Sequence, residues 1–134
     1  KNIMISNSHI HGITRDKLSI QDARSFDNVF VQFKEWIYSL YGENKVFLIA
    51  HNCFAFDMRF MEVECKRHGL IIPSNWIFID SLVQFRKYNI GFENYKLSTL
   101  YELVKDDSIE ISGNLHNSLT DVKILRFVYV KLIF

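Results

Sequence analysis

The chain has 134 residues, of which 49% are hydrophobic and 15% aromatic, which is enough for one hydrophobic core but not for several domains. Its formal net charge of +1 carries no strong electrostatic signature of a nucleic-acid partner, so such a site has to be argued from particular residues. No apolar stretch is long enough to cross a bilayer, and the two cysteines form neither a disulfide framework nor a metal-binding motif.

The first predicted helix runs from Ser25, a favourable N-cap, to about Tyr41. Its apolar residues recur at helical spacing, and Gly42 follows where a C-cap glycine belongs. Residues 46–50 form a short, continuous apolar run. Such a run predicts a strand that is buried on both faces of a sheet.

The next predicted elements alternate between helix and strand. They are a helix from near Asp57 to Gly69, a strand at 76–79, a short helix from Asp80 or Ser81, and a helix capped by Ser98 that runs to Val104. A last helix is expected to begin near Asn117 and to bury Leu119, Val122, Leu125, Val128 and Tyr129.

Strands that alternate with helices predict an α/β fold, with a sheet flanked by helices. Only two strands are strongly indicated, which is few for a stable sheet, so we expect the first strands to be missing. The chain does not begin with methionine and ends within an apolar run that has no helix stop signal. We therefore expect residues 1–134 to be a partial domain of a longer protein.

A first candidate site follows the strand at 46–50. His51 and Asn52 come directly after this strand, and Phe56 and Asp57 lead into the next helix. Ligands of open α/β sheets bind beyond the carboxyl ends of strands, which is where Asp57 is expected. Taken alone, Asp57 fits the role of a helix cap, which aspartate often fills, and Phe56 could equally be a core residue.

A second candidate site lies at the start of the last helix. Asn117 is the expected N-cap, which places His116 just outside the helix and Asp121 in or near its first turn. The helix dipole favours a carboxylate there. The alternative is an ordinary helix start with a surface histidine.

Together these residues resemble the DEDDh exonucleases, which are DnaQ-like members of the RNase H-like superfamily. The matching motifs are Ala50-His51-Asn52, Phe56-Asp57, and His116 with Asp121, and Ile10-His11-Gly12 resembles the segment before the family's first long helix. The three matches occur in the family's order along the chain. The resemblance implies an RNase H-like exonuclease fold with a mixed sheet flanked by helices.

The resemblance also implies a 3′→5′ exonuclease that hydrolyses DNA or RNA with two Mg²⁺ (or Mn²⁺) ions. Asp57 and Asp121 would be metal ligands, and His116 would be the general base. His11 and Phe56 match positions that contact the terminal nucleotide. Cys53 and Cys65 are expected to be free thiols, which indicates an intracellular, reducing compartment, and no membrane partner is indicated.

One motif of the family is absent. Its first motif, Asp-x-Glu, supplies the other two metal ligands and occurs nowhere in these 134 residues. We therefore expect the motif to precede Lys1 and this fragment to be poorly active by itself. Two alternatives remain: a non-catalytic relative that binds nucleic acid or protein, and an unrelated α/β domain in which Asp57 and Asp121, like Asp80, are only helix caps.

Overall fold

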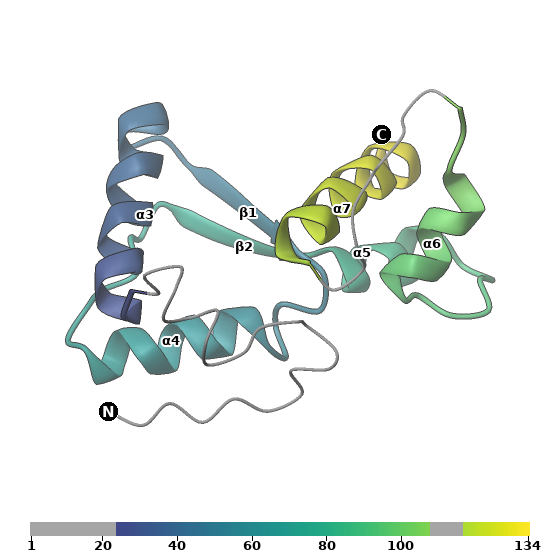
Figure 1. Ribbon diagram of the computed structural model, residues 1–134. Helices are drawn as coiled ribbons and strands as arrows, with labels where there is room; N and C mark the ends of the chain where they lie inside the picture. The colour runs from purple at the N-terminus through teal and green to yellow at the C-terminus, as the bar shows by residue number, and fades with distance from the viewer. Residues whose placement is uncertain (1–23, 108–116) are drawn as a thin grey trace.

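The computed structural model of the chain describes residues 24–107 and 117–134 (Figure 1). Its elements are α3 (Phe26–Tyr41), β1 (Val46–Ala50), α4 (Asp57–Arg67), β2 (Trp76–Asp80), α5 (Ser81–Tyr88), α6 (Leu97–Val104) and α7 (Ser118–Ile133). No helix in these two ranges has the length and apolar character needed to cross a membrane.

The described strands form a small parallel sheet. β1 pairs with β2 from Val46 beside Trp76 to Ala50 beside Asp80, and α4 lies in the connection between them. Parallel strands require such a crossover, and a helix usually provides it. The predicted α/β architecture, with a sheet flanked by helices, is confirmed.

The hydrophobic residues gather in two clusters, one on each side of the strand ends. In the first, Phe30 and Ile37 of α3 pack with Val46, Trp76 and Cys65, which come from β1, β2 and α4. The second lies beyond the carboxyl ends of the strands, where α5, α6 and α7 meet (Figure 1). Its buried residues are Phe85, Leu100, Ile124, Val128 and Tyr129.

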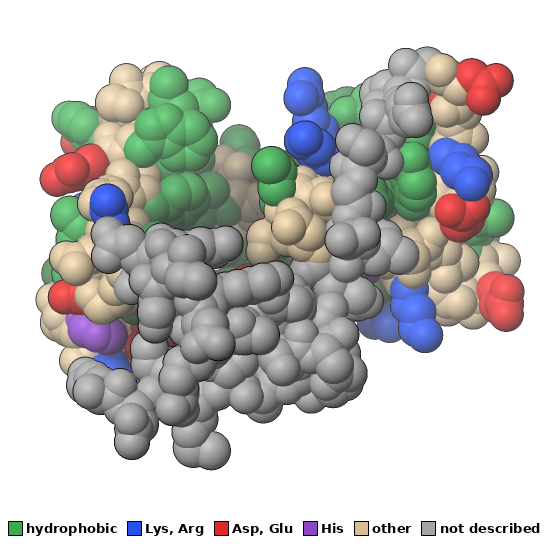
Figure 2. All heavy atoms as spheres, viewed as in Figure 1, with side chains coloured by type: hydrophobic (Ala, Val, Ile, Leu, Met, Phe, Trp, Pro, Cys, Tyr) green, Lys and Arg blue, Asp and Glu red, His purple; other side chains and the backbone are tan. Residues whose placement is uncertain are grey.

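The prediction that residues 46–50 are buried on both faces is wrong for one face. Phe47 is 56% exposed and Ile49 is 38% exposed, whereas Val46 is buried and Leu48 is half-buried. The described helices cover the face that carries Val46 and Leu48, because α3 packs there. In the view of Figure 2, hydrophobic side chains are visible at the surface beside α3.

Two details of the helices also differ from prediction. Ser98 is the second residue of α6 rather than its cap, because the helix begins at Leu97 after Lys96. In α7, Leu119 and Val122 are exposed, and the buried face instead contains Thr120, Ile124 and Phe127 together with Val128 and Tyr129. Since α7 carries apolar residues on every side, spacing alone does not identify the side that packs against α5 and α6.

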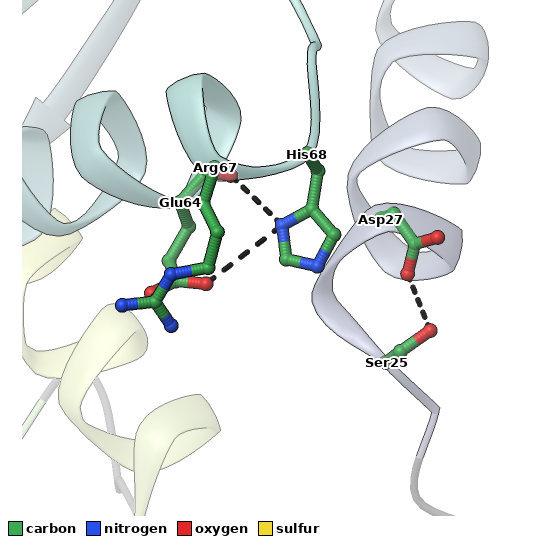
Figure 3. A network of polar contacts seen from close by, with 5 residues as sticks. All are labelled: Ser25, Asp27, Glu64, Arg67 and His68. Atoms are coloured by element: carbon green, nitrogen blue, oxygen red, sulfur yellow. Dashed lines mark hydrogen bonds and ion pairs between the residues drawn. The ribbon is translucent and has the colours of Figure 1, made fainter.

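The start of α3 lies near the end of α4 (Figure 3). Glu64 forms an ion pair with Arg67 at 3.0 Å, and the His68 ring contacts Phe26 at 5.8 Å between centroids. Ser25 occupies the predicted N-cap position but makes no cap hydrogen bond. Its hydroxyl donates instead to Asp27 and lowers the pKa of that exposed carboxyl.

Candidate active site

The candidate site is built where β1 and β2 end. Because Ala50 pairs with Asp80 in a parallel register, the residues that follow Ala50 lie beside Asp80 and Ser81. β2 continues directly into α5, whereas β1 is followed by a turn over residues 51–56 that leads into α4. Asp57 belongs to α4, which begins after the turn that follows β1. Asp121 belongs to α7, which packs in the second hydrophobic cluster.

The Asp80 carboxylate accepts hydrogen bonds from three backbone N–H groups at this edge. Its side chain is almost fully buried, at 3% exposure for the residue. Oδ1 accepts hydrogen bonds from Leu82 N at 3.0 Å and from Asn52 N at 2.8 Å, and Oδ2 accepts one from Phe54 N at 3.1 Å. The predicted role as a helix cap is thus confirmed, and two further bonds reach the turn after β1.

His51 is the second polar group of this edge. Its Nε2 lies 2.7 Å from the carbonyl oxygen of Tyr95, which can only accept, so Nε2 carries the proton. Nδ1 lies 2.9 Å from the Ser81 hydroxyl and accepts from it when the ring is neutral. Burial lowers the pKa of His51, which favours this neutral form, although the bond to Tyr95 opposes the shift. With both nitrogens engaged, His51 is a structural residue and not a candidate base.

Cys53 lies beneath the same turn and is fully buried. Its thiol donates to the carbonyl oxygen of Ile79 at 3.5 Å. Burial raises the pKa of this thiol, and the negative charges of Asp80 and Asp57 raise it further. Cys65 is also buried, and both cysteines are free thiols in the structure.

Asp57 is the first residue of α4 and is exposed. The turn that precedes it is joined to the helix by a hydrogen bond from Met58 N to Cys53 O at 2.8 Å. Phe56, at 65% exposure, is not part of the core, which removes the packing alternative for this residue. An exposed aromatic ring and an exposed carboxylate are therefore adjacent in the chain where the turn after β1 joins α4.

Asp121 lies in the first turn of α7 and is half-buried. Its backbone N–H donates to Asn117 O at 2.9 Å. The predicted N-cap is confirmed, because Asn117 Oδ1 accepts from Leu119 N at 3.1 Å and from Thr120 N at 3.4 Å. A carboxylate in this first turn is stabilised by the helix dipole.

The other predicted site residues, His11 and His116, lie outside the described residues. Within the described ranges, no three histidine, cysteine or acidic side chains form a group that could hold a metal ion. Asp57 and Asp121 nevertheless offer carboxylate oxygens, the donor type that Mg²⁺ prefers. The donor chemistry therefore fits a hard divalent cation as part of a larger ligand set.

The sequence did not reveal how Asp80, His51 and Ser81 cooperate. The usable signal was that each apolar strand run is followed directly by polar residues: His51 and Asn52 after one, Asp80 and Ser81 after the other. In parallel strands of equal length, such residues meet at one edge. That signal predicts proximity, but it does not predict which backbone groups the side chains bind.

Comparison with known proteins places this geometry in context. A family model described as exonuclease (RNase_T) matches residues 1–129. The exonuclease DPD1, chloroplastic/mitochondrial, of Arabidopsis thaliana is 33% identical over 133 residues, which cover 97% of this chain and 42% of that protein. DNA polymerase III PolC-type of Bacillus subtilis is 32% identical over 122 residues, which cover 91% of this chain and 8% of the polymerase.

A similar polymerase from Staphylococcus epidermidis is 27% identical over 121 residues, or 90% of this chain and 7% of that protein. The chain thus spans less than half the length of each of these relatives. The family match extends through both candidate aspartates and over nearly the whole chain.

Proposed function

The chain belongs to the exonuclease family as an RNase H-like exonuclease domain, and from this premise we propose that it removes nucleotides from the 3′ end of DNA or RNA with two Mg²⁺ or Mn²⁺ ions. The observation that carries the proposal is the placement of Asp57. It is an exposed carboxylate at the start of α4, one turn beyond the carboxyl end of β1. Ligands of α/β sheets bind at such an edge.

In this proposal, Asp57 and Asp121 hold the metal ions together with two further carboxylates of the kind found in the Asp-x-Glu motif. When bound, such ions activate the attacking water and stabilise the leaving 3′-oxygen. His116 accepts the proton of that water, a role that suits an imidazole with a pKa near neutral pH. His51 is unsuited to that role, because both of its ring nitrogens are already hydrogen-bonded.

The nucleic acid would be bound by an aromatic surface next to the metal ligands. Phe56 is exposed and precedes Asp57, so its ring is available to stack on the terminal base. His11 is proposed to contact the same nucleotide. The two buried, unpaired thiols support a reducing, intracellular compartment.

A nuclease assay on the protein at its natural length tests this function. With Mg²⁺, we expect mononucleotides to be released from the 3′ end of a labelled single strand. His116→Ala should slow the reaction by about 10²- to 10⁴-fold, because it removes the general base. Asp57→Ala should lower both activity and Mn²⁺ affinity.

His68→Ala is the matched control, because His68 lies at the end of α4 and contacts Glu64 rather than the strand ends (Figure 3). It should leave the rate unchanged. A protein that binds the 3′-ended strand but cleaves none with either metal would contradict the proposal and favour a non-catalytic relative. Release of nucleotides from the 5′ end would contradict the proposed direction.

A further inference from the structure

The carboxylate of Asp80 does more than a helix cap requires. Capping α5 needs only the bond from Leu82 N, two residues further along the chain. The bonds from Asn52 N and Phe54 N reach back 28 and 26 residues to a different segment. A buried carboxylate is stable only when its oxygens are well hydrogen-bonded, so these backbone donors also keep Asp80 in place.

The turn that Asp80 holds has an unusual backbone. Asn52 has a φ of +60°, a left-handed conformation that asparagine tolerates better than most residues. Asn52 and Phe54 both direct their N–H groups at the same carboxylate. From Phe54 the chain needs only three more residues to reach Asp57, and Met58 N closes the turn onto Cys53 O.

The hydrogen bonds in this part of the structure hold the backbone of the turn rather than the Asp57 side chain, which is exposed at the surface. The position of the Asp57 carboxylate therefore depends on the position of the turn backbone. The turn is held at one end by the hydrogen bonds to Asp80 and at the other by the bond from Met58 N, in the first turn of α4, to Cys53 O.

We propose that Asp80 is a positioning residue: by binding the N–H groups of Asn52 and Phe54, its buried carboxylate fixes Asp57 and so sets the affinity of the metal site. This inference rests on the proposed function, in which Asp57 is a metal ligand. Residues that orient ligands from outside the coordination sphere commonly change metal affinity by about 10- to 100-fold when replaced.

Two substitutions separate positioning from capping. Asp80→Asn retains an oxygen at the Oδ1 position for Leu82 N and Asn52 N, but it places an amide N–H₂ opposite Phe54 N, where two donors face each other. Asp80→Ser still caps α5, since serine is a favourable N-cap, but it is too short to reach the turn. The first variant loses one bond to the turn and the second loses both.

Asn75→Ala is the matched control. The Asn75 side chain also makes two long-range bonds to backbone, from Nδ2 to Asn44 O at 2.8 Å and to Gly42 O at 3.3 Å. These bonds lie at the opposite, amino ends of the strands. The variant therefore loses comparable bonds without disturbing the turn before Asp57.

The first measurement is Mn²⁺ binding without substrate, by calorimetry on the protein at its natural length. We expect about 10-fold weaker binding for Asp80→Asn, a larger loss for Asp80→Ser and no change for Asn75→Ala. The second is amide hydrogen exchange without metal. In Asp80→Asn, Phe54 should exchange faster while Leu82 keeps its protection.

The outcomes separate the two proposals. If Asp57→Ala binds Mn²⁺ normally, Asp57 is not a ligand and the proposed function fails. If Asp57→Ala binds weakly but both Asp80 variants bind normally, positioning by Asp80 is wrong and the function stands. If neither Asp80 variant folds, amide hydrogen exchange in the unaltered protein tests the inference instead. If a fixed turn strengthens Mn²⁺ binding, then Mn²⁺ binding must in return stabilise the turn and increase the protection of the Phe54 amide. No such increase would overturn the inference.

Discussion

His51 shows how a single side chain can couple this edge of the sheet to pH. Its ring lies between the Ser81 hydroxyl and the Tyr95 carbonyl and contacts the buried ring of Phe85, at 5.9 Å between centroids. Burial lowers the pKa of the ring below the ordinary value of 6.5. In the unfolded chain the ring regains that ordinary value, so the unfolded state binds a proton more readily than the folded state.

The stability of the protein should therefore fall with pH in a defined range. The contribution of neutral His51 is complete above about pH 6.5 and is lost as the pH falls from there toward the lowered pKa of the folded state. We expect the melting temperature to fall more between pH 7.5 and 5.5 in the unaltered protein than in His51→Gln, which does not titrate. Equal decreases in the two proteins would contradict this assignment.

At the scale of single elements, the residue at which α7 begins is fixed mainly by its N-cap. Its surface is apolar on several sides, with Leu119 and Val122 exposed, so hydrophobic burial fixes its start only weakly. Asn117 provides the sharper signal, because its side chain accepts from two N–H groups that the helix leaves without partners. The cap also determines where Asp121 falls within the first turn.

Removal of this cap should destabilise the protein measurably. Asn117→Ala is expected to lower the free energy of unfolding by about 1 kcal/mol, the usual cost of losing an asparagine N-cap. Urea denaturation at neutral pH measures this loss. Asn117→Asp is the control and should be close to neutral, because aspartate caps a helix equally well; a similar loss in both variants would argue against a capping role.

The sequence predicted the elements well, because their signals are local. Apolar spacing and the cap residues Asp80 and Asn117 placed the strands and most helix ends within a residue or two of where they lie. The buried face of α7 was not predictable, since it depends on which neighbours pack there. The bonds from Asp80 to Asn52 and Phe54 were equally inaccessible, because residues so far apart in sequence meet only once the strands are in register.

At the scale of the whole molecule, a polar seam lies between the two hydrophobic clusters of the described residues. The cluster around Trp76 lies on one side of the strand ends, and the cluster around Leu100 lies on the other. The seam consists of Asp80, His51 and Ser81, which bind groups on both sides of it. The candidate aspartates therefore depend on both clusters being packed.

A substitution that creates a cavity in the second cluster should test how much this cluster contributes to the free energy of unfolding. Leu100 is fully buried, and Leu100→Ala is expected to cost about 2–5 kcal/mol of the free energy of unfolding. Ile90, which is 85% exposed, is the control, and Ile90→Ala should change stability by less than about 0.5 kcal/mol. Thermal unfolding followed by circular dichroism measures both, and equal small losses would show that this cluster is not part of the stable core.

The direct junction between β2 and α5 has a consequence for how the domain can change in length during evolution. Asp80 is the last residue of the strand and Ser81 the first of the helix, so no linker separates them. One inserted residue there would leave Asp80 in register beside Ala50 but would move Leu82 N away from its carboxylate, so α5 would lose its N-cap bond and rotate relative to the strand. The segment between α4 and β2 lies at the other end of the strands and can absorb insertions far more readily. Natural variation in length should therefore accumulate before β2 and be absent at the junction that follows it.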